Sequence, residues 1–209
     1  MGGKRYEVLA SLLLIALIEQ LVGCVGSVGS GNATASKDSH STTGAPMVCI
    51  LASCVRTQLD KAIEKSTEKN VPEEKRSVAV ERAVRLEKML NGVKILWVDD
   101  SPENNDAERN LFVSLGTRVN LARTTEAAIS SLKTPSYDLV ISDMRRGGDE
   151  TAGLQLLSEI RKLGKPTPVI FYAAGFDPGR GVPPYAFGMT NRPDELLHLV
   201  LDVIERLRS

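Results

Sequence analysis

Residues 94–105 read KILWVDDSPENN. The apolar run over 95–98 is typical of a buried strand, and it ends at two adjacent carboxylates, Asp99 and Asp100. Two like charges held this close repel each other, and each resists the loss of its water. The pair therefore needs either bulk water or a bound cation, and which of the two it has decides what the chain does.

Further apolar runs follow the first one and alternate with helical patterns. Strands are expected at 93–98, 117–122, 138–143, 168–173 and 185–190. Helices are expected at 102–115, 124–133, 152–163 and 193–207. This alternation predicts a parallel sheet with helices on both faces, and the unbroken apolar runs LVIS and VIFYA fit burial on both sides. The functional site of such an open α/β sheet lies at the carboxyl ends of its strands.

A third carboxylate, Asp143, ends the third expected strand. Three carboxylates at one edge of a sheet require a hard cation, and Mg²⁺ suits them because it takes oxygen ligands. A carboxylate beside bound Mg²⁺ can act as a nucleophile on phosphorus. Arg192, which follows the fifth strand, can then pair with the phosphoryl oxygens or with Asp143 itself.

Residues 93–209 resemble the receiver domain of bacterial two-component response regulators, in a divergent, stand-alone form without an output domain. The matching stretches are KILWVDDSPENN, YDLVISDM, GLQLLSEIRK, TPVIFYAA and the pair Arg192-Pro193. The resemblance implies a flavodoxin-like (βα)5 fold with a doubly wound five-stranded parallel sheet. It also implies a signalling module in a phosphorelay, not an enzyme, that acts through contacts with a histidine kinase or another signalling protein.

The same resemblance assigns roles to individual residues. Asp99 and Asp100 would bind Mg²⁺, and Asp143 would be both the phosphoacceptor and a metal ligand. Arg145, two residues further on, would give its backbone carbonyl to the metal.

Three departures from the family put the response to phosphate in doubt. The Ser or Thr that ends the fourth strand of receivers is replaced by Ala173 (or by Ala174, in the adjacent register), and the lysine of the family is replaced by Arg192. The segment 176–184, FDPGRGVPP, cannot form the fourth helix because it holds two glycines and three prolines. The alternative function is therefore a phosphorylation-independent pseudo-receiver that serves as an interaction module.

Other classes of protein fit less well. A phosphatase-type hydrolase of the haloacid-dehalogenase kind needs Asp-x-Asp after the first strand, and DDSP does not offer it. A flavodoxin-like cofactor protein needs a Ser/Thr/Gly-rich phosphate loop in place of SPENN. Lys+Arg and Asp+Glu both total 26, so no basic excess points to nucleic acid. Three cysteines without a Cys-x-x-Cys pair and two distant histidines support no further metal site.

Before the receiver-like domain at 92–209, three further segments are expected. Residues 1–26 form an apolar membrane or signal segment, in which 8–26 could anchor the chain in a membrane. Residues 27–55 form a flexible linker with a short apolar patch, and 56–91 form a charged segment with two helices. The receiver domain is expected in the cytoplasm, attached to the membrane, while LVGC at 21–24 resembles a lipoprotein box and leaves an exported lipoprotein as the alternative.

Smaller features of the sequence are open to two interpretations. A stripe of Ala79, Ala83, Leu86 and Leu90 along the 72–90 helix could serve self-association or partner docking, or could rest on the domain's own surface. Arg145-Arg146 could bind an anion or be a solvated pair in a loop. Tyr172 is expected in the sheet core and His198 at the surface or boundary of the last helix.

Overall fold

The computed structural model describes residues 45–133, 137–164, 167–175, 179 and 181–209. The predicted membrane or signal segment at 1–26 lies outside these residues, as does most of the predicted linker. Among the helices that are described, none has the length and apolar character needed to cross a membrane.

Five parallel strands form one sheet in the order β2-β1-β3-β4-β5. The strands are β1 (Lys94–Val98), β2 (Arg118–Ala122), β3 (Leu139–Ser142), β4 (Val169–Tyr172) and β5 (Gly188–Thr190). The side chains of β3 are all buried because helices cover both faces of the sheet. The predicted doubly wound, flavodoxin-like sheet is therefore confirmed.

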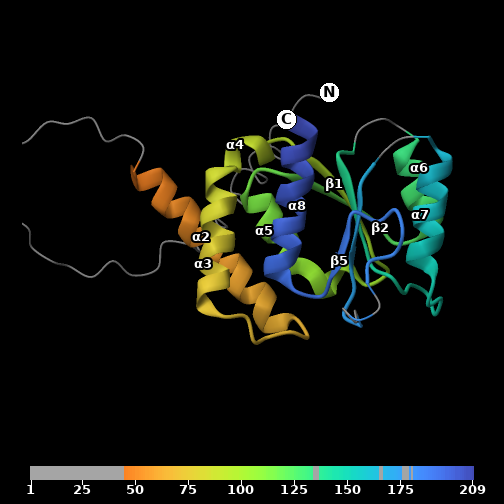
Figure 1. The fold of residues 1–209 in the computed structure, drawn as a ribbon, viewed down its shortest axis with the longest axis horizontal. Helices are drawn as coiled ribbons and strands as arrows, with labels where there is room; N and C mark the ends of the chain where they lie inside the picture. Colours follow the sequence, from red (N-terminus) through yellow and green to blue (C-terminus); the bar gives the residue numbers. More distant parts are fainter. Residues whose placement is uncertain (1–44, 134–136, 165–166, 176–178, 180) are drawn as a thin grey trace, which may run out of the picture. The chain divides into compact units, whose positions relative to one another are not determined.

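Helices cover the two faces of the sheet (Figure 1). α6 and α7 lie on one face, and α5 and α8 lie on the other, with the 3-10 helix η1 leading into α5. Their bounds are η1 (Pro102–Asn105), α5 (Asp106–Ser114), α6 (Thr125–Leu132), α7 (Ala152–Lys162) and α8 (Pro193–Arg208). α8 begins as its sequence predicts, since Pro193 occupies the first turn and two acids, Asp194 and Glu195, follow it.

Between β4 and β5 the described residues contain no α-helix, in agreement with the glycines and prolines of that segment. The predicted start of the fifth strand at Tyr185 is wrong. Tyr185 has φ 71°, a left-handed backbone conformation that a strand does not use, and β5 begins only at Gly188.

The chain enters the described region through three helices, α2 (Ala45–Lys65), α3 (Glu73–Arg85) and α4 (Glu87–Leu90). The first helix was expected from residue 56, and this expectation is wrong because the apolar patch forms the first part of α2. Leu51, Val55 and Leu59 recur every four residues and so share one face of a helix, which packs on the core. The expected division between a linker and a helical segment after residue 55 therefore does not hold.

α2 and α3 form an additional layer over α5 and α8 (Figure 1). Ala79, Ala83 and Leu90 of the apolar stripe are buried against the chain itself, so this stripe rests on the domain's own surface. Ion pairs hold the layer, including Arg82 with Asp202 of α8 at 2.5 Å. Residues 44–209 form one compact unit, and the charged helices are part of it.

Candidate functional site

The predicted acidic cluster forms where two neighbouring strands end. Val98 of β1 pairs with Ser142 of β3, so the residues that follow them, Asp99 and Asp143, emerge side by side. The N–H of Asp143 donates to the carbonyl of Val98 at 3.0 Å and continues the strand pairing by one residue. One carboxylate oxygen from each of Asp99, Asp100 and Asp143 lies within 4.8 Å of the others. The structure therefore brings together the three acids that the sequence singled out.

Neutral donors hold these carboxylates. Asp99, which is 5% exposed, accepts from the N–H of Ser101 at 2.8 Å and from the side-chain amide of Asn105 at 2.5 Å. Asp143 accepts from the N–H of Met144 at 2.7 Å. Within the described part of the chain, none of the three acids forms an ion pair within 4.0 Å. The cluster therefore concentrates negative charge at the edge of the sheet.

The third acid, Asp100, is held by a tight turn after β3. Gly147 and Gly148 have φ of 58° and 82°, a left-handed pair that only glycine adopts without a steric cost. Arg146 and Asp149, on either side, exchange backbone hydrogen bonds at 3.1 and 2.9 Å and close the turn. The turn directs the N–H of Gly147 at Asp100 Oδ2, 2.7 Å away. The sequence prediction treated this glycine pair only as a loop.

The phosphoacceptor candidate is electrostatically perturbed. Burial raises the pKa of the Asp143 carboxyl, and the negative charge of Asp99 acts in the same direction, while the backbone N–H of Met144 opposes them. A shared cation would relieve this repulsion, because it stabilises every carboxylate in its charged form.

Two adjacent arginines follow Asp143 and differ in environment. Arg146 is 6% exposed, and its guanidinium donates to the carbonyl of Asp143 at 2.5 Å and to Ser142 Oγ at 2.7 Å, so a solvated role is wrong for this residue. Burial lowers the pKa of Arg146. Arg145 is exposed and forms an ion pair with Glu150 at 3.8 Å. Arg146 is therefore buried beneath the loop that follows β3 and holds it by hydrogen bonds, whereas the side chain of Arg145 is exposed.

A cavity of about 270 Å³ lies in front of the three acids, and we call it the acid cavity. Its wall includes Arg145 and Ala174 but also residues that sequence reasoning did not assign to a site. These are Glu108 and Tyr172, from the α5/α8 side of the sheet, and Lys65, Ser66 and Thr67 at the end of α2.

Glu108 is the unexpected acid of this cavity. It is 2% exposed and accepts from the Tyr172 hydroxyl at 2.9 Å, and burial raises the pKa of its carboxyl. A signal existed in the sequence, because Glu108 is a charge in the helical register of the buried Leu111 and Phe112. Tyr172 was expected only in the core, and its hydroxyl in fact reaches the cavity wall.

Arg192 does not line the acid cavity. Its guanidinium contacts Asp194 and, at 3.0 Å, Glu195, and it lines a different cavity together with His198. The expected contact of Arg192 with Asp143 or with a phosphoryl group stays a prediction that these ion pairs disfavour.

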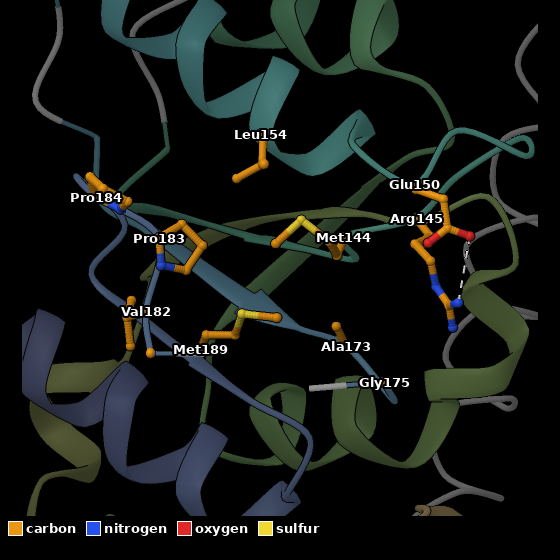
Figure 2. A pocket seen from close by; sticks show the side chains of 11 residues that line it. Met144, Arg145, Glu150, Leu154, Ala173, Gly175, Val182, Pro183, Pro184 and Met189 are labelled. Atoms are coloured by element: carbon orange, nitrogen blue, oxygen red, sulfur yellow. Dashed lines mark ion pairs between the residues drawn. The ribbon is translucent and has the colours of Figure 1, made fainter. Parts of the chain in front are cut away.

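A second, larger cavity of about 720 Å³ shares Arg145 with the first and is lined in part by residues 181–184, from the segment between β4 and β5. Figure 2 shows Met144 and Met189 near its centre, with Leu154 above Met144, Pro183 to the left of both methionines and the Arg145–Glu150 ion pair to the right. Ala173 lines this second cavity and Ala174 the acid cavity, so neither register of the fourth strand brings a hydroxyl to the site.

The donor set of the acid cavity fits Mg²⁺. Three carboxylates offer one oxygen each from a preformed cluster, and Mg²⁺ is bound through a few carboxylates while it keeps waters of its own. Sulfur and imidazole ligands, which would favour other metals, are not part of this cavity wall.

Comparison with known proteins identifies the region that carries this cluster. Residues 95–180 match the family model of the response regulator receiver domain. This region is a response-regulator receiver domain. The match includes Asp99, Asp100 and Asp143, and it ends before β5 and α8.

The receiver domain has relatives among curated proteins and solved structures. Sensor histidine kinase AruS from Pseudomonas aeruginosa is 29% identical over 104 residues, which are 48% of this chain and 10% of that protein, so the chain spans about a tenth of this curated relative. Response regulator protein TrrA from Thermotoga maritima, solved in complex with Mg²⁺-BeF, is 27% identical over 53% of this chain and 98% of its own, with a TM-score of 0.47. A two-component response regulator from Clostridium difficile is 21% identical over 56% of this chain and 99% of its own, also with a TM-score of 0.47.

Proposed function

We propose that the receiver domain is a Mg²⁺-dependent phosphoacceptor in a phosphorelay and that Asp143 accepts the phosphoryl group. The observation that carries the proposal is the approach of one oxygen from each of Asp99, Asp100 and Asp143 to within 4.8 Å, at the carboxyl edge of a receiver sheet. Asp99 and Asp100 would hold Mg²⁺ together with Asp143. The backbone carbonyl of Arg145 remains the proposed fourth protein ligand.

The chain's own residues prepare Asp143 for attack on phosphorus. The Met144 N–H fixes Asp143 Oδ1 at 2.7 Å and so orients the carboxylate, whose other oxygen is the nucleophile. With a phosphohistidine donor, a bond forms between this oxygen and phosphorus, and the P–N bond of the donor breaks. The imidazole nitrogen keeps the electron pair. Bound Mg²⁺ would supply neutralisation of the charge on the transferring group.

The partner that fits this chemistry is a histidine kinase or another signalling protein that carries a phosphohistidine. The similarity to part of a sensor histidine kinase supports a partner from this class. The proposed role is signalling through protein–protein contacts and not turnover of a substrate.

The experiment is phosphorylation of the full chain by acetyl phosphate with and without Mg²⁺, followed by intact mass spectrometry. We expect the mass of one phosphoryl group to be added only with Mg²⁺, and Asp143→Asn to abolish the addition. Asp138→Asn is the matched control, because Asp138 flanks the opposite end of the same strand, where it accepts from the N–H of Lys94. No addition in the native chain, or equal addition in Asp143→Asn, would overturn the proposal.

A second candidate function is the phosphorylation-independent pseudo-receiver. It is favoured by the ion pairs of Arg192 and by the absence of a hydroxyl at both Ala173 and Ala174. The same experiment separates the two functions, since a pseudo-receiver gains no phosphoryl group at any Mg²⁺ concentration.

A further inference from the structure

The acid cavity needs a side-chain cation once a phosphoryl group is attached. Before phosphorylation, three carboxylates carry three negative charges against the two positive charges of Mg²⁺. In the acyl phosphate the charge of Asp143 is replaced by up to two charges on the phosphoryl group, so up to four negative charges then face the same Mg²⁺. Receiver domains of the usual pattern meet this need with a lysine after the fifth strand, and here the residue at that place, Arg192, is engaged with Asp194 and Glu195.

Two cationic side chains line the acid cavity, Lys65 and Arg145. Arg145 already pairs with Glu150 at 3.8 Å, and its guanidinium extends to Gly175, at the border of the second cavity. The side-chain ammonium group of Lys65 forms no hydrogen bond or ion pair with any residue in the described ranges. Of the two, Lys65 is therefore the cation without a competing partner.

The position of Lys65 is fixed although its side chain is exposed. It is the last residue of α2, and the two residues that precede Glu64 in this turn, Ala62 and Ile63, are buried in the core. Ser66 then caps the turn, with its hydroxyl donating to the carbonyl of Ile63 at 2.9 Å. The backbone thus holds the ammonium group at the rim of the acid cavity, while its flexible stem lets it reach inward.

Glu108 provides an independent sign that a cation belongs in this cavity. Its Oε1 accepts from Tyr172, but its Oε2 is buried and has no hydrogen-bond partner among the described residues. The positive charge of Lys65 acts on this carboxyl from across the cavity and favours its charged form, against the effect of burial. An unpaired buried carboxylate oxygen and an unpaired ammonium group therefore line one cavity.

We propose that Lys65, supplied by α2 from outside the receiver sheet, is the cation that binds the phosphoryl group at Asp143, and that the negative charge of Glu108 attracts it toward the cavity when the phosphoryl group is absent. The proposal rests on the proposed function of Asp143. It makes the α2–α3 layer, and not a fourth helix, the part of the molecule that contacts the phosphoryl group.

The test uses the full chain with Mg²⁺ and beryllofluoride, a mimic of the phosphoryl group, and follows the fluorescence of Trp97. Trp97 is a suitable reporter because its ring lies 6.1 Å, centroid to centroid, from that of Tyr172, whose hydroxyl binds Glu108. We expect Lys65→Met to weaken beryllofluoride binding by about tenfold or more, since it removes a charge-assisted hydrogen bond. Lys65→Arg should retain most of the affinity.

The matched control is Lys61→Met, one turn earlier on α2, because Lys61 is exposed and does not line the cavity. It should bind beryllofluoride as the native chain does. The affinity of Lys65→Met for Mg²⁺ alone should be equal to or tighter than that of the native chain, whereas a general structural disturbance would weaken both affinities.

The outcomes separate the two proposals. If the native chain binds beryllofluoride and Lys65→Met binds it equally well, the role of Lys65 is wrong and that of Asp143 stands. If Arg145→Met causes the loss instead, Arg145 is the cation. If the native chain does not respond to Mg²⁺ and beryllofluoride at all, the proposed function fails and the role of Lys65 fails with it.

Discussion

The guanidinium of Arg192 contacts both carboxylate oxygens of Asp194, with Nε 3.1 Å from Oδ1 and Nη2 2.6 Å from Oδ2. Asp194 is 2% exposed, and Arg192 is its ion-pair partner. The hydrogen bonds that Arg192 donates to Asp194 raise the pKa of the guanidinium. The residue that the family pattern places at the phosphoryl group thus stabilises the start of α8.

The first prediction concerns this ion pair. Arg192→Met should lower the free energy of unfolding by about 2 kcal/mol, because it leaves the buried carboxylate of Asp194 unpaired. This loss is smaller than that for a fully buried ion pair, because Arg192 is partly exposed. Urea denaturation measures it. Beryllofluoride affinity should stay within about twofold of native, and a large loss of affinity with native stability would show instead that Arg192 reaches the phosphoryl group.

The second prediction is a pH dependence caused by Glu108. Burial raises the pKa of this carboxyl above its ordinary value of 4.5, so the folded state holds the proton more tightly than the unfolded state. The stability of the native chain therefore falls as the pH rises from 4.5 through the pKa that Glu108 has in the folded state. Above that pKa the loss of stability is complete. Glu108→Gln, which keeps an acceptor for Tyr172, should raise Tm at pH 7.

Thermal unfolding at a series of pH values checks this expectation. The gain in Tm should vanish below pH 4, where both chains are neutral at this position. A gain of the same size at every pH would mean that the charge of Glu108 is not its cause.

The third prediction concerns the close approach of α7 to the loop that carries Asp143, after β3. A Cβ at Gly153 would lie 2.9 Å from Phe171 Cε1, 3.0 Å from the carbonyl oxygen of Asp143 and 3.0 Å from Met144 Cα. Gly153→Ala should therefore cost about 1–3 kcal/mol of stability and weaken Mg²⁺ binding, since the backbone beside Asp143 must move.

The control is Gly164→Ala, at the end of α7. Gly164 has φ 68° and open space around its added Cβ, so the variant should cost about 1 kcal/mol through backbone strain alone. Calorimetric titration with Mg²⁺ should then distinguish the variants, and equal Mg²⁺ affinity in both would contradict the predicted movement of the loop.

The fourth prediction tests whether α2 belongs to the receiver core. Leu59 is fully buried and Ile50, on the same helix, is 67% exposed. Leu59→Ala should lower the free energy of unfolding by about 2–5 kcal/mol, and Ile50→Ala should change it by less than about 0.5 kcal/mol. A native-like Leu59→Ala variant would indicate that α2 is not packed on α5 in solution.

Much of the receiver sheet could be predicted because each of its strands and helices is encoded by a pattern of neighbouring residues. Each strand is a short run of apolar residues, and each helix carries an apolar face at regular spacing. The meeting of Asp99 with Asp143 also followed from topology alone, since parallel strands bring their carboxyl ends to one edge.

What could not be predicted depends on contacts between distant parts of the chain. The direction of Arg192 is decided by a carboxylate two residues further on, and a contact with Asp143 was equally compatible with the sequence. Lys65 and Glu108 line one cavity because α2 packs on α5, across more than forty residues of sequence. The spacing of apolar residues in a helix shows which face is buried, but it does not show which other helix covers that face.

α2 is a continuous helix of 21 residues, which gives it a length of about 30 Å. Its last residue is at the rim of the acid cavity, and its first, Ala45, joins the helix to residues 1–44. A helix of this length acts as a lever: a tilt of about 10° around its Lys65 end would displace its other end by about 5 Å. Any tilt at the acid-cavity end of α2 would thereby become a larger displacement at the end that joins residues 1–44.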